Sequence, residues 1–170
     1  MINHIFAACL MIAAQTYAVP PQVLVGILHV EGGRIGQQVA NTNGTYDLGP
    51  MQINSLWVPE LADNWKVSRK TAWKLLRDDG CTNVNVAAWI LRQHLTETGS
   101  LAKAVAHYHS RTPSKGLRYK SKVVDVMRKK GLLAKSAVPS VRDASPKMAA
   151  GKSPAKRVAL ETQKESEDKG

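Results

Sequence analysis

The sequence predicts an all-α fold in a single domain, followed by a disordered tail. Apolar residues recur at helical spacing through most of the chain, and no stretch alternates apolar and polar residues as a half-buried strand would. The composition changes near residue 133: the segment 134–170 has one Leu, no aromatic residue and many Lys, Ser, Pro, Ala and Glu residues. Such a segment buries too little apolar surface to offset the entropy lost on ordering. We therefore expect residues 1–132 to form the domain and residues 133–170 a disordered basic tail.

The first half of the domain is expected to hold two helices and a long loop. A first helix is expected over residues 4–17, and Pro20-Pro21 suits the first turn of a second helix. Gly32-Gly33 ends this second helix, so Glu31 lies in its last turn. The segment 32–50 is rich in Gly and Asn, which predicts a loop.

The rest of the domain is expected to be helical. The strongest pattern covers residues 82–95, where Val84, Ala88, Leu91 and Leu95 share one face. We expect this helix to be buried at the centre, with the others packed around it. Further helices are expected over residues 51–57, after a cap at Ser68, over 101–108 and over 115–130.

The net charge of +11 is unevenly distributed. Residues 1–132 carry sixteen Lys/Arg against eight Asp/Glu, and nine basic residues lie between Lys103 and Lys130 against Asp125 alone. This run could bind an acidic polymer such as cell-wall glycopeptide, anionic lipid or nucleic acid. It could equally be the solvated face of a helix.

Several common catalytic and cofactor motifs are absent from the sequence. There is no Gly-rich phosphate loop, no HExxH zinc motif and no serine nucleophile elbow. The five histidines are scattered without metal-ligand spacing, so we expect them to be surface or partly packed residues. Neither a metal nor a cofactor is therefore expected.

Glu31 is the first candidate for chemistry. It follows an apolar helix and precedes two glycines, which allow backbone or ligand to approach closely. A carboxyl where a helix enters the core should have its pKa raised toward the range of a general acid. A solvent-facing glutamate at a helix end is an equally good interpretation of the same pattern.

A second candidate is the segment 41–54, NTNGTYDLGPMQIN, which is dense in amide and hydroxyl groups. Gln52 and Asn54 would offer donors and acceptors to sugar hydroxyl and N-acetyl groups, although the segment also fits an ordinary polar loop. Tyr108 ends an Ala-rich helix, where it could pack in the core or reach a catalytic carboxyl across a cleft.

Taken in order, these features resemble the soluble lytic transglycosylase family. A helix ending in Glu is followed by Gly-x-Met-Gln-Ile-Asn, by a helix like VNVAAWIL and by AVAHYHS, which contains Tyr108. The resemblance covers about residues 9–128 and is most specific in NGTYDLGPMQIN. It implies a lysozyme-like fold and, more narrowly, resembles the small members that accompany type IV secretion, conjugation and type III secretion machines.

The resemblance implies a role for each matched residue. Glu31 matches the catalytic glutamate, the residues Met51, Gln52 and Asn54 match the segment that lines the glycan groove, and Tyr108 matches the tyrosine of the Ala-Tyr-Asn-Ala-Gly type motif. The sequence departs from the family where Gly32 replaces Ser, where Pro50 replaces Leu and where His109-Ser110 replaces Asn-Ala.

The family mechanism implied for this chain needs one carboxyl group. Glu31 would protonate the oxygen that leaves from C4 of N-acetylglucosamine, and then take a proton from the C6 hydroxyl of N-acetylmuramic acid to close a 1,6-anhydro ring. Asp47 is the only nearby second carboxylate, and we expect it to cap loop N–H groups. If it held a water opposite Glu31, the enzyme would be a hydrolytic muramidase. A third interpretation is a non-catalytic wall- or DNA-binding adaptor.

Cys9 and Cys81 have no CxxC spacing, and from the residues alone they are either free thiols or one long-range disulfide. Related secretion-associated members carry a cysteine pair at these places, so the resemblance implies a disulfide and an oxidising compartment such as the periplasm or cell envelope. It also argues against cleavage after Ala18, which would remove Cys9, and residues 1–18 could serve as an uncleaved signal and first helix at once. The expected partners are peptidoglycan strands and secretion or conjugation proteins, with no nucleic acid and a monomeric chain.

Overall fold

The computed structural model describes residues 4–133 and consists mainly of helices. The helices are α1 (His4–Thr16), α2 (Pro21–Glu31), α3 (Val58–Trp65), α4 (Arg69–Asp78), α5 (Gly80–Thr98), α6 (Leu101–His109) and α7 (Pro113–Lys129), with a 3-10 turn η1 (Ser55–Trp57). The strands are β1 (Gln38–Ala40), β2 (Tyr46–Leu48) and β3 (Ile53–Asn54). The predicted all-α class is confirmed, and the expected tail lies outside the described residues except for Leu133.

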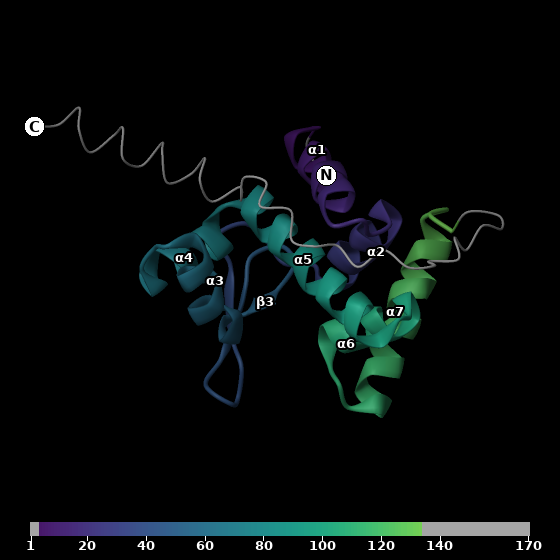
Figure 1. Ribbon diagram of the computed structural model, residues 1–170. Coiled ribbons are helices and arrows are strands. Elements are labelled where there is room, and N and C mark those ends of the chain that lie inside the picture. Colours follow the sequence, from purple (N-terminus) through teal and green to yellow (C-terminus); the bar gives the residue numbers. More distant parts are fainter. Residues whose placement is uncertain (1–3, 134–170) are drawn as a thin grey trace, which may run out of the picture.

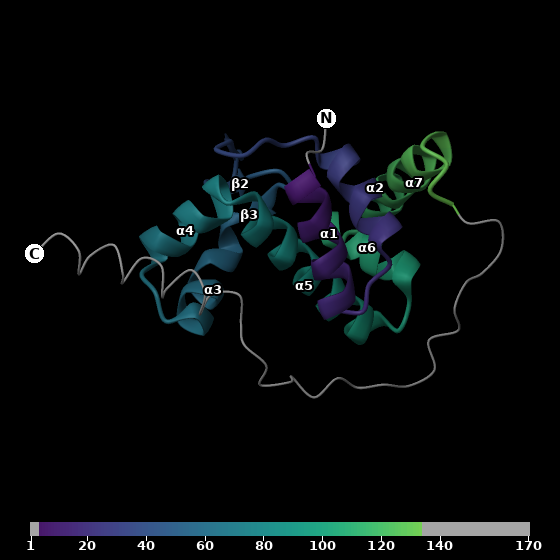
Figure 2. The same cartoon turned by 90° about the horizontal axis from the view of Figure 1, so that it is seen from above.

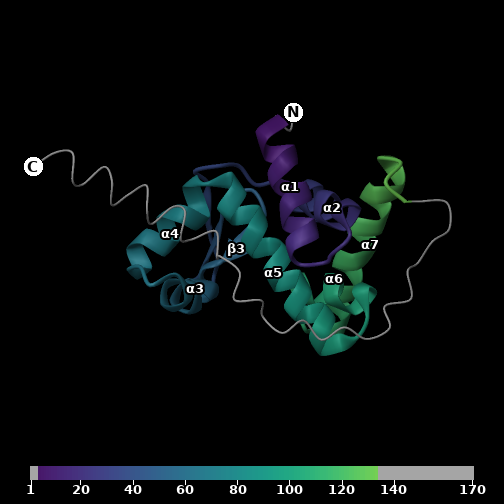
Figure 3. The ribbon, with the colours of Figure 1, turned by 45° about the horizontal axis from the view of Figure 1, so that its top comes forward.

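Helix α5 runs through the middle of the molecule, as its apolar pattern predicted (Figure 1). The sheet, α3 and α4 lie on one side of it, and α1, α2, α6 and α7 lie on the other, which is clearest in Figure 3. All four residues of the predicted face are buried: Val84, Ala88, Leu91 and Leu95. A helix covered on both sides is the only one that can hold two lobes together, so α5 fixes how the lobes face each other.

The helix ends follow local capping chemistry. Ser68 accepts a hydrogen bond from the N–H of Thr71, and Asp79 accepts one from Thr82, so these side chains begin α4 and α5. Helix α2 ends at Gly32, whose φ of 60° is the left-handed conformation that glycine adopts without strain. The boundaries of these helices therefore lie within a few residues of the predicted ones.

The segment 38–57 differs from the prediction. Instead of a plain loop and a helix over residues 51–57, it forms a three-stranded antiparallel sheet in the order β1-β2-β3, followed by η1. Strands of two or three residues are too short to show an alternating pattern, which is why the sequence concealed them. Asn43-Gly44 forms the turn of the first hairpin, where the N–H of Asn41 donates to the carbonyl of Thr45 at 2.8 Å.

A disulfide joins Cys9 on α1 to Cys81 on α5, which confirms the implied pairing. The bond closes a sequence separation of 72 residues, and α1 packs beside α5, as seen from above in Figure 2. A crosslink over so long a loop restricts the unfolded chain strongly. It therefore attaches the first helix to the centre of the fold.

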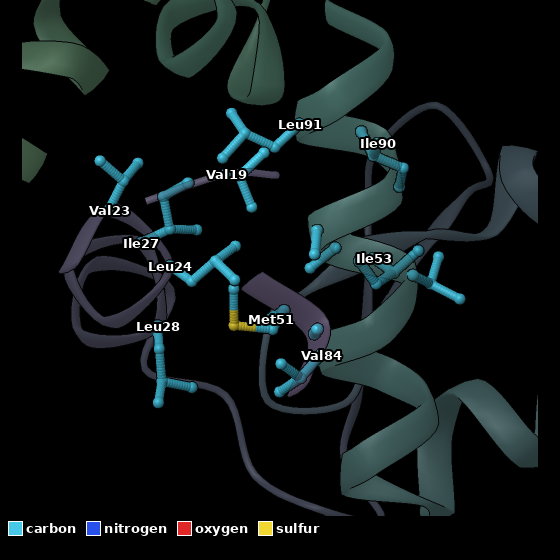
Figure 4. Close-up of a cluster of buried hydrophobic side chains, with 14 of the residues drawn as sticks. Val19, Val23, Leu24, Ile27, Leu28, Met51, Ile53, Val84, Ile90 and Leu91 are labelled. Atoms are coloured by element: carbon cyan, nitrogen blue, oxygen red, sulfur yellow. The ribbon is translucent and has the colours of Figure 1, made fainter. Parts of the chain in front are cut away.

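The hydrophobic core is shared by α2, α5 and the turn before β3 (Figure 4). Met51 is fully buried, and its side chain lies between Leu24 and Leu28 of α2 and Val84 of α5. The segment that carries the predicted groove residues is thus fixed to the core by its own methionine.

The side-chain amide of Asn83 on α5 is fully buried and hydrogen-bonds to the backbone of three other segments. Its Oδ1 accepts the N–H of Met51 at 2.7 Å, and its Nδ2 donates to the carbonyls of Leu48 and Leu76, both at 2.9 Å. A buried backbone group that lacks a partner destabilises the fold, so this side chain replaces the pairing that a longer sheet would supply. It fixes the end of β2, the turn before β3 and the last turn of α4 to the central helix.

Within residues 4–133, no helix is both long enough and apolar enough to cross a membrane.

Replacing Asn83 by Ala should lower the free energy of unfolding by about 3 kcal/mol, because the N–H of Met51 and the two carbonyls are left buried without their partner. Urea denaturation followed by circular dichroism would measure the change. Asn64→Ala is the matched control, since Asn64 is exposed on α3, and it should change the free energy by less than about 0.5 kcal/mol. Equal stability of the two variants would contradict the structural role of Asn83.

Candidate active site

A cleft of about 600 Å³ lies between the sheet region and helices α5–α7. Its lining residues come from both lobes, with the sheet and its loops on one side and α6 and α7 on the other. The lining residues are Glu31, Ala40, Asn41, Thr42, Asn43, Thr45, Asp47, Gln52, Ile53, Asn54, Trp57, Ile90, Tyr108, His109, Ser110 and Lys115. Most of these side chains are polar but uncharged, which suits a ligand rich in hydroxyl and amide groups.

Glu31 lies at one wall of the cleft, at the last residue of α2. The pKa of its carboxyl is raised from the usual 4.5 to about 7, mainly by burial; the hydrogen bond from Tyr119 lowers it and the charge of Asp47 raises it. The carbonyl end of a helix also disfavours negative charge. A carboxyl with a pKa near 7 holds its proton at neutral pH in about half of the molecules, so it can both give and take one.

Tyr119 on α7 was not among the predicted site residues, yet it makes the closest contact to Glu31. Its hydroxyl donates to Oε1 of Glu31 at 2.5 Å, and its ring stacks on the imidazole of His109 with centroids 4.8 Å apart. Burial and the nearby Glu31 raise the pKa of Tyr119, so the hydroxyl remains a donor. The available signal was that Tyr119 shares the buried face of α7 with Val123 and Met127, at helical spacing.

Gly33 allows the loop of the sheet to approach the end of α2. A Cβ at this position would lie 2.2 Å from the carbonyl oxygen of Gly49 and 2.6 Å from Nε2 of Gln52, so no side chain fits. The predicted close approach at the glycine pair is thus found at Gly33. Gln52, whose φ of 49° is left-handed, donates from Nε2 to the carbonyl of Gly49 at 2.8 Å. A non-glycine residue in this conformation is uncommon and is typical of functional sites.

Asp47 and Asn54 face the cleft as a hydrogen-bonded pair. They are opposite one another on β2 and β3, and Nδ2 of Asn54 donates to Oδ1 of Asp47 at 3.0 Å and to Oγ1 of Thr45 at 3.1 Å. Oδ1 of Asn54 accepts the N–H of Leu56 and caps η1. Asp47 lies in a strand rather than capping a loop, and its carboxylate shares the cleft with Glu31.

A hydrogen bond links Tyr108 to Met51, and the two residues differ in their relation to the cleft. The hydroxyl of Tyr108 donates to the main-chain carbonyl of Met51 at 3.0 Å, and its pKa is raised by burial and by the charges of Glu31 and Asp47. Tyr108 lines the cleft, whereas the side chain of Met51 is buried in the core and does not. The tyrosine that hydrogen-bonds to Glu31 is therefore Tyr119, and Tyr108 fixes the turn that precedes β3.

The basic residues are spread over exposed surface. On α7, the side chains of Lys115, Arg118 and Lys122 are exposed, which fits the solvated-face interpretation of the run from Lys103 to Lys130. A separate hollow of about 510 Å³ at α4 is lined by four basic residues and by Trp73. It contains no carboxyl group among its lining residues, so it has no acid to offer to a reaction.

The α-rich fold, with a cleft that contains the partly buried carboxyl of Glu31, defines a lysozyme-like domain. A family model described as "Transglycosylase SLT domain" matches residues 8–123, which is more than half of the chain. The chain belongs to this family, the soluble lytic transglycosylases, which are enzymes that act on peptidoglycan. Its substrate is thus located outside the cytoplasm. No curated protein matches the chain.

The raised pKa of Glu31 predicts a pH-dependent stability. The folded chain holds this proton up to about pH 7, whereas the unfolded chain releases it near 4.5, so stability should fall as the pH rises through this window. The loss relative to Glu31→Gln, which does not titrate, should be about 3 kcal/mol. Urea denaturation of both proteins at pH 4.5 and pH 8 would measure it. Parallel changes in the two proteins would contradict the raised pKa.

Removing the hydroxyl in Tyr119→Phe should raise the pKa of Glu31, because the lost hydrogen bond stabilised its charged form. Carbon NMR titration of the Glu31 carboxyl would show the shift. The high-pH limb of peptidoglycan cleavage should move upward, with about tenfold lower activity because the carboxyl is less well oriented. Tyr17→Phe is the matched control, since the Tyr17 hydroxyl donates to Asn85 and neither residue lines the cleft. An unchanged titration in Tyr119→Phe would rule out this role.

Proposed function

We propose that Glu31 is the single acid and base of a transglycosylase reaction at the β-1,4 bond between N-acetylmuramic acid and N-acetylglucosamine. The observation that carries this proposal is a partly buried cleft carboxyl with a pKa of about 7 and an oriented hydrogen-bond donor, Tyr119. Both protonation states of such a group are accessible near neutral pH, and the proposed reaction uses both in turn.

In the first step, protonated Glu31 gives its proton to the glycosidic oxygen, which leaves with C4 of N-acetylglucosamine. The carbonyl oxygen of the N-acetyl group on N-acetylmuramic acid attacks C1 as that bond breaks, so no second carboxylate is needed as nucleophile. In the second step, ionised Glu31 takes the proton of the C6 hydroxyl, and O6 attacks C1 and displaces the acetamido oxygen. The product is a 1,6-anhydro ring, Glu31 is protonated again and no water is consumed.

The neighbouring groups support this cycle without titrating themselves. Burial raises the pKa of both Tyr108 and Tyr119, so each remains a neutral donor. Tyr119 keeps Oε1 of Glu31 in place, and its hydrogen bond favours the ionised form that the second step requires. His109 stacks on Tyr119. Burial lowers the pKa of this histidine, so it brings no positive charge to the acid at neutral pH.

We assign glycan binding to Gln52, Asn54 and Tyr108, whose side chains line the cleft. Met51 contributes through its carbonyl, which receives the Tyr108 hydroxyl and so keeps the two walls of the cleft together. Asp47 adds a negative charge to the cleft. Such a charge stabilises the positive character that develops at C1 in glycoside cleavage.

Asp47 also gives a second candidate function. It shares the cleft with Glu31 and raises the pKa of that carboxyl, as the second carboxylate of a hydrolytic muramidase would. Asn54 already holds Oδ1 of Asp47, which supports a fixed electrostatic role over the binding of an attacking water.

The proposed setting is the periplasm, where this monomeric enzyme would open the wall locally for a secretion or conjugation apparatus. Support comes from the resemblance to small machine-associated members and from the Cys9–Cys81 disulfide, which suits an oxidising compartment. We propose residues 1–132 as the catalytic domain and the basic residues 133–170 as its tail.

Digestion of purified peptidoglycan, followed by mass spectrometry of the soluble muropeptides, tests the proposal. The wild-type chain should release products that end in 1,6-anhydro-N-acetylmuramic acid. Glu31→Gln should reduce their release by about 10²–10⁴-fold or more, because the residue supplies both proton transfers. Glu60→Gln, at an exposed glutamate on α3, is the matched control and should retain full activity.

Other products would lead to other conclusions. Products about 18 Da heavier, with a reducing end, would establish hydrolysis and direct attention to Asp47. Full activity in Glu31→Gln would exclude Glu31 as the acid. Salt-sensitive binding to the wall without any released product would favour the adaptor interpretation.

A further inference from the structure

Three potential metal ligands lie together where α5 and α6 pack against each other. His94 and Glu97 are one turn apart on α5, and His107 comes from α6. One ligand atom from each residue lies within 4.8 Å of those from the other two. None of the three lines the cleft. The spacing along the chain concealed this group, because thirteen positions separate the two histidines and the fold alone brings them together.

Two imidazole nitrogens in this group are buried without a hydrogen bond. Nδ1 of His94 and Nδ1 of His107 have no partner among the described residues, and His94 is only 7% exposed. Oε2 of Glu97 is 3.7 Å from Nδ1 of His94, which is too long for a hydrogen bond. A buried polar atom without a partner is unfavourable, so each of these two nitrogens calls for an explanation such as a bound ion.

The two imidazoles come from different helices, His94 from α5 and His107 from α6. An imidazole nitrogen is the commonest protein ligand of transition-metal ions. The His94 and His107 rings meet edge to face with centroids 5.9 Å apart, so one ring does not lie flat over the other.

Glu97 is at present paired with Arg111. Nη1 and Nη2 of Arg111 donate to Oε1 and Oε2 of Glu97 at 2.5 and 2.8 Å, and both side chains are largely exposed. An exposed ion pair contributes little to stability, because water screens it and both side chains lose freedom. The carboxylate can therefore turn from Arg111 toward the imidazoles at small cost.

We propose that His94, Glu97 and His107 form a binding site for a divalent transition-metal ion of the zinc type. Two imidazole nitrogens and one carboxylate oxygen make a common three-ligand set for Zn²⁺, and water completes the tetrahedron. With bonds of about 2.1 Å, tetrahedral ligand atoms lie roughly 3.4 Å apart, so the group needs to contract by little more than an ångström. Side-chain rotation at exposed Glu97 and half-buried His107 supplies this movement.

A bound ion would link α5 to α6 and release Arg111. His107 directly precedes Tyr108, and Arg111 directly follows Ser110, and both Tyr108 and Ser110 line the cleft. The ion would thus stabilise the wall of the cleft that α6 forms. The site does not depend on the proposed reaction, and zinc binding is measured without peptidoglycan.

The test uses the full-length, untagged chain after treatment with a chelator. Isothermal titration with zinc chloride gives stoichiometry and affinity, and absorption with cobalt chloride reports whether the coordination is tetrahedral. His107→Ala and Glu97→Gln should each raise the Kd by about tenfold or more, since changes in the surroundings of metal ligands alone have effects of that size. Glu97 is exposed, so its variant tests the site even if His107→Ala folds poorly.

The matched controls are His29→Ala, at an exposed histidine on α2, and His109→Ala, at the histidine that lines the cleft. One zinc ion per chain, unchanged affinity in both controls and weakened binding in both site variants would support the proposal. It would be overturned if the wild-type chain shows no saturable binding, or if His107→Ala and Glu97→Gln bind as tightly as wild type. Loss of binding in His109→Ala alone would also overturn it, because the ion would then belong to the cleft.

Discussion

The arrangement of the cleft depends on the buried amide of Asn83. This side chain hydrogen-bonds to the backbone at Met51, Leu48 and Leu76, and it sits on the helix that separates the two lobes. The sheet is too small to satisfy its own ends, since its strands have only two or three residues. A single amide on α5 therefore positions the turn before β3, and with it every cleft residue of the sheet side.

The environment of the Glu31 carboxyl depends on the same arrangement from the other lobe. Helix α2 carries Glu31 to its last turn, Gly32 ends the helix, and Gly33 leaves room for the carbonyls of the sheet loop. This close approach, together with α7, buries the carboxyl and raises its pKa to about 7. Tyr119 then limits the rise by donating to the charged form. The resulting balance of burial and hydrogen bonding is what a group that alternates between acid and base requires.

Helix α6 connects the cleft to the histidine–glutamate group proposed to bind a metal. One face presents Tyr108 to the carbonyl of Met51, and the neighbouring position presents His107 to His94 on α5. Adjacent residues on a helix point about 100° apart, so a short helix can serve two sites without sharing side chains. An interaction that stabilises the α5–α6 contact therefore also stabilises the wall of the cleft that α6 forms.

Most of the helices, the central place of α5, the position of Glu31 at the end of α2 and the family were predictable from the sequence. These features depend on local periodicity, on capping residues and on a motif that is continuous along the chain. The tertiary structure alone decided which groups meet. Tyr119 is 88 positions from Glu31, Asn83 is 32 from Met51, and His107 reaches His94 from another helix. Strands of two or three residues leave no periodic signal in the sequence, and neither do contacts between residues so far apart. Both form because the whole domain packs together, and not because of local propensity.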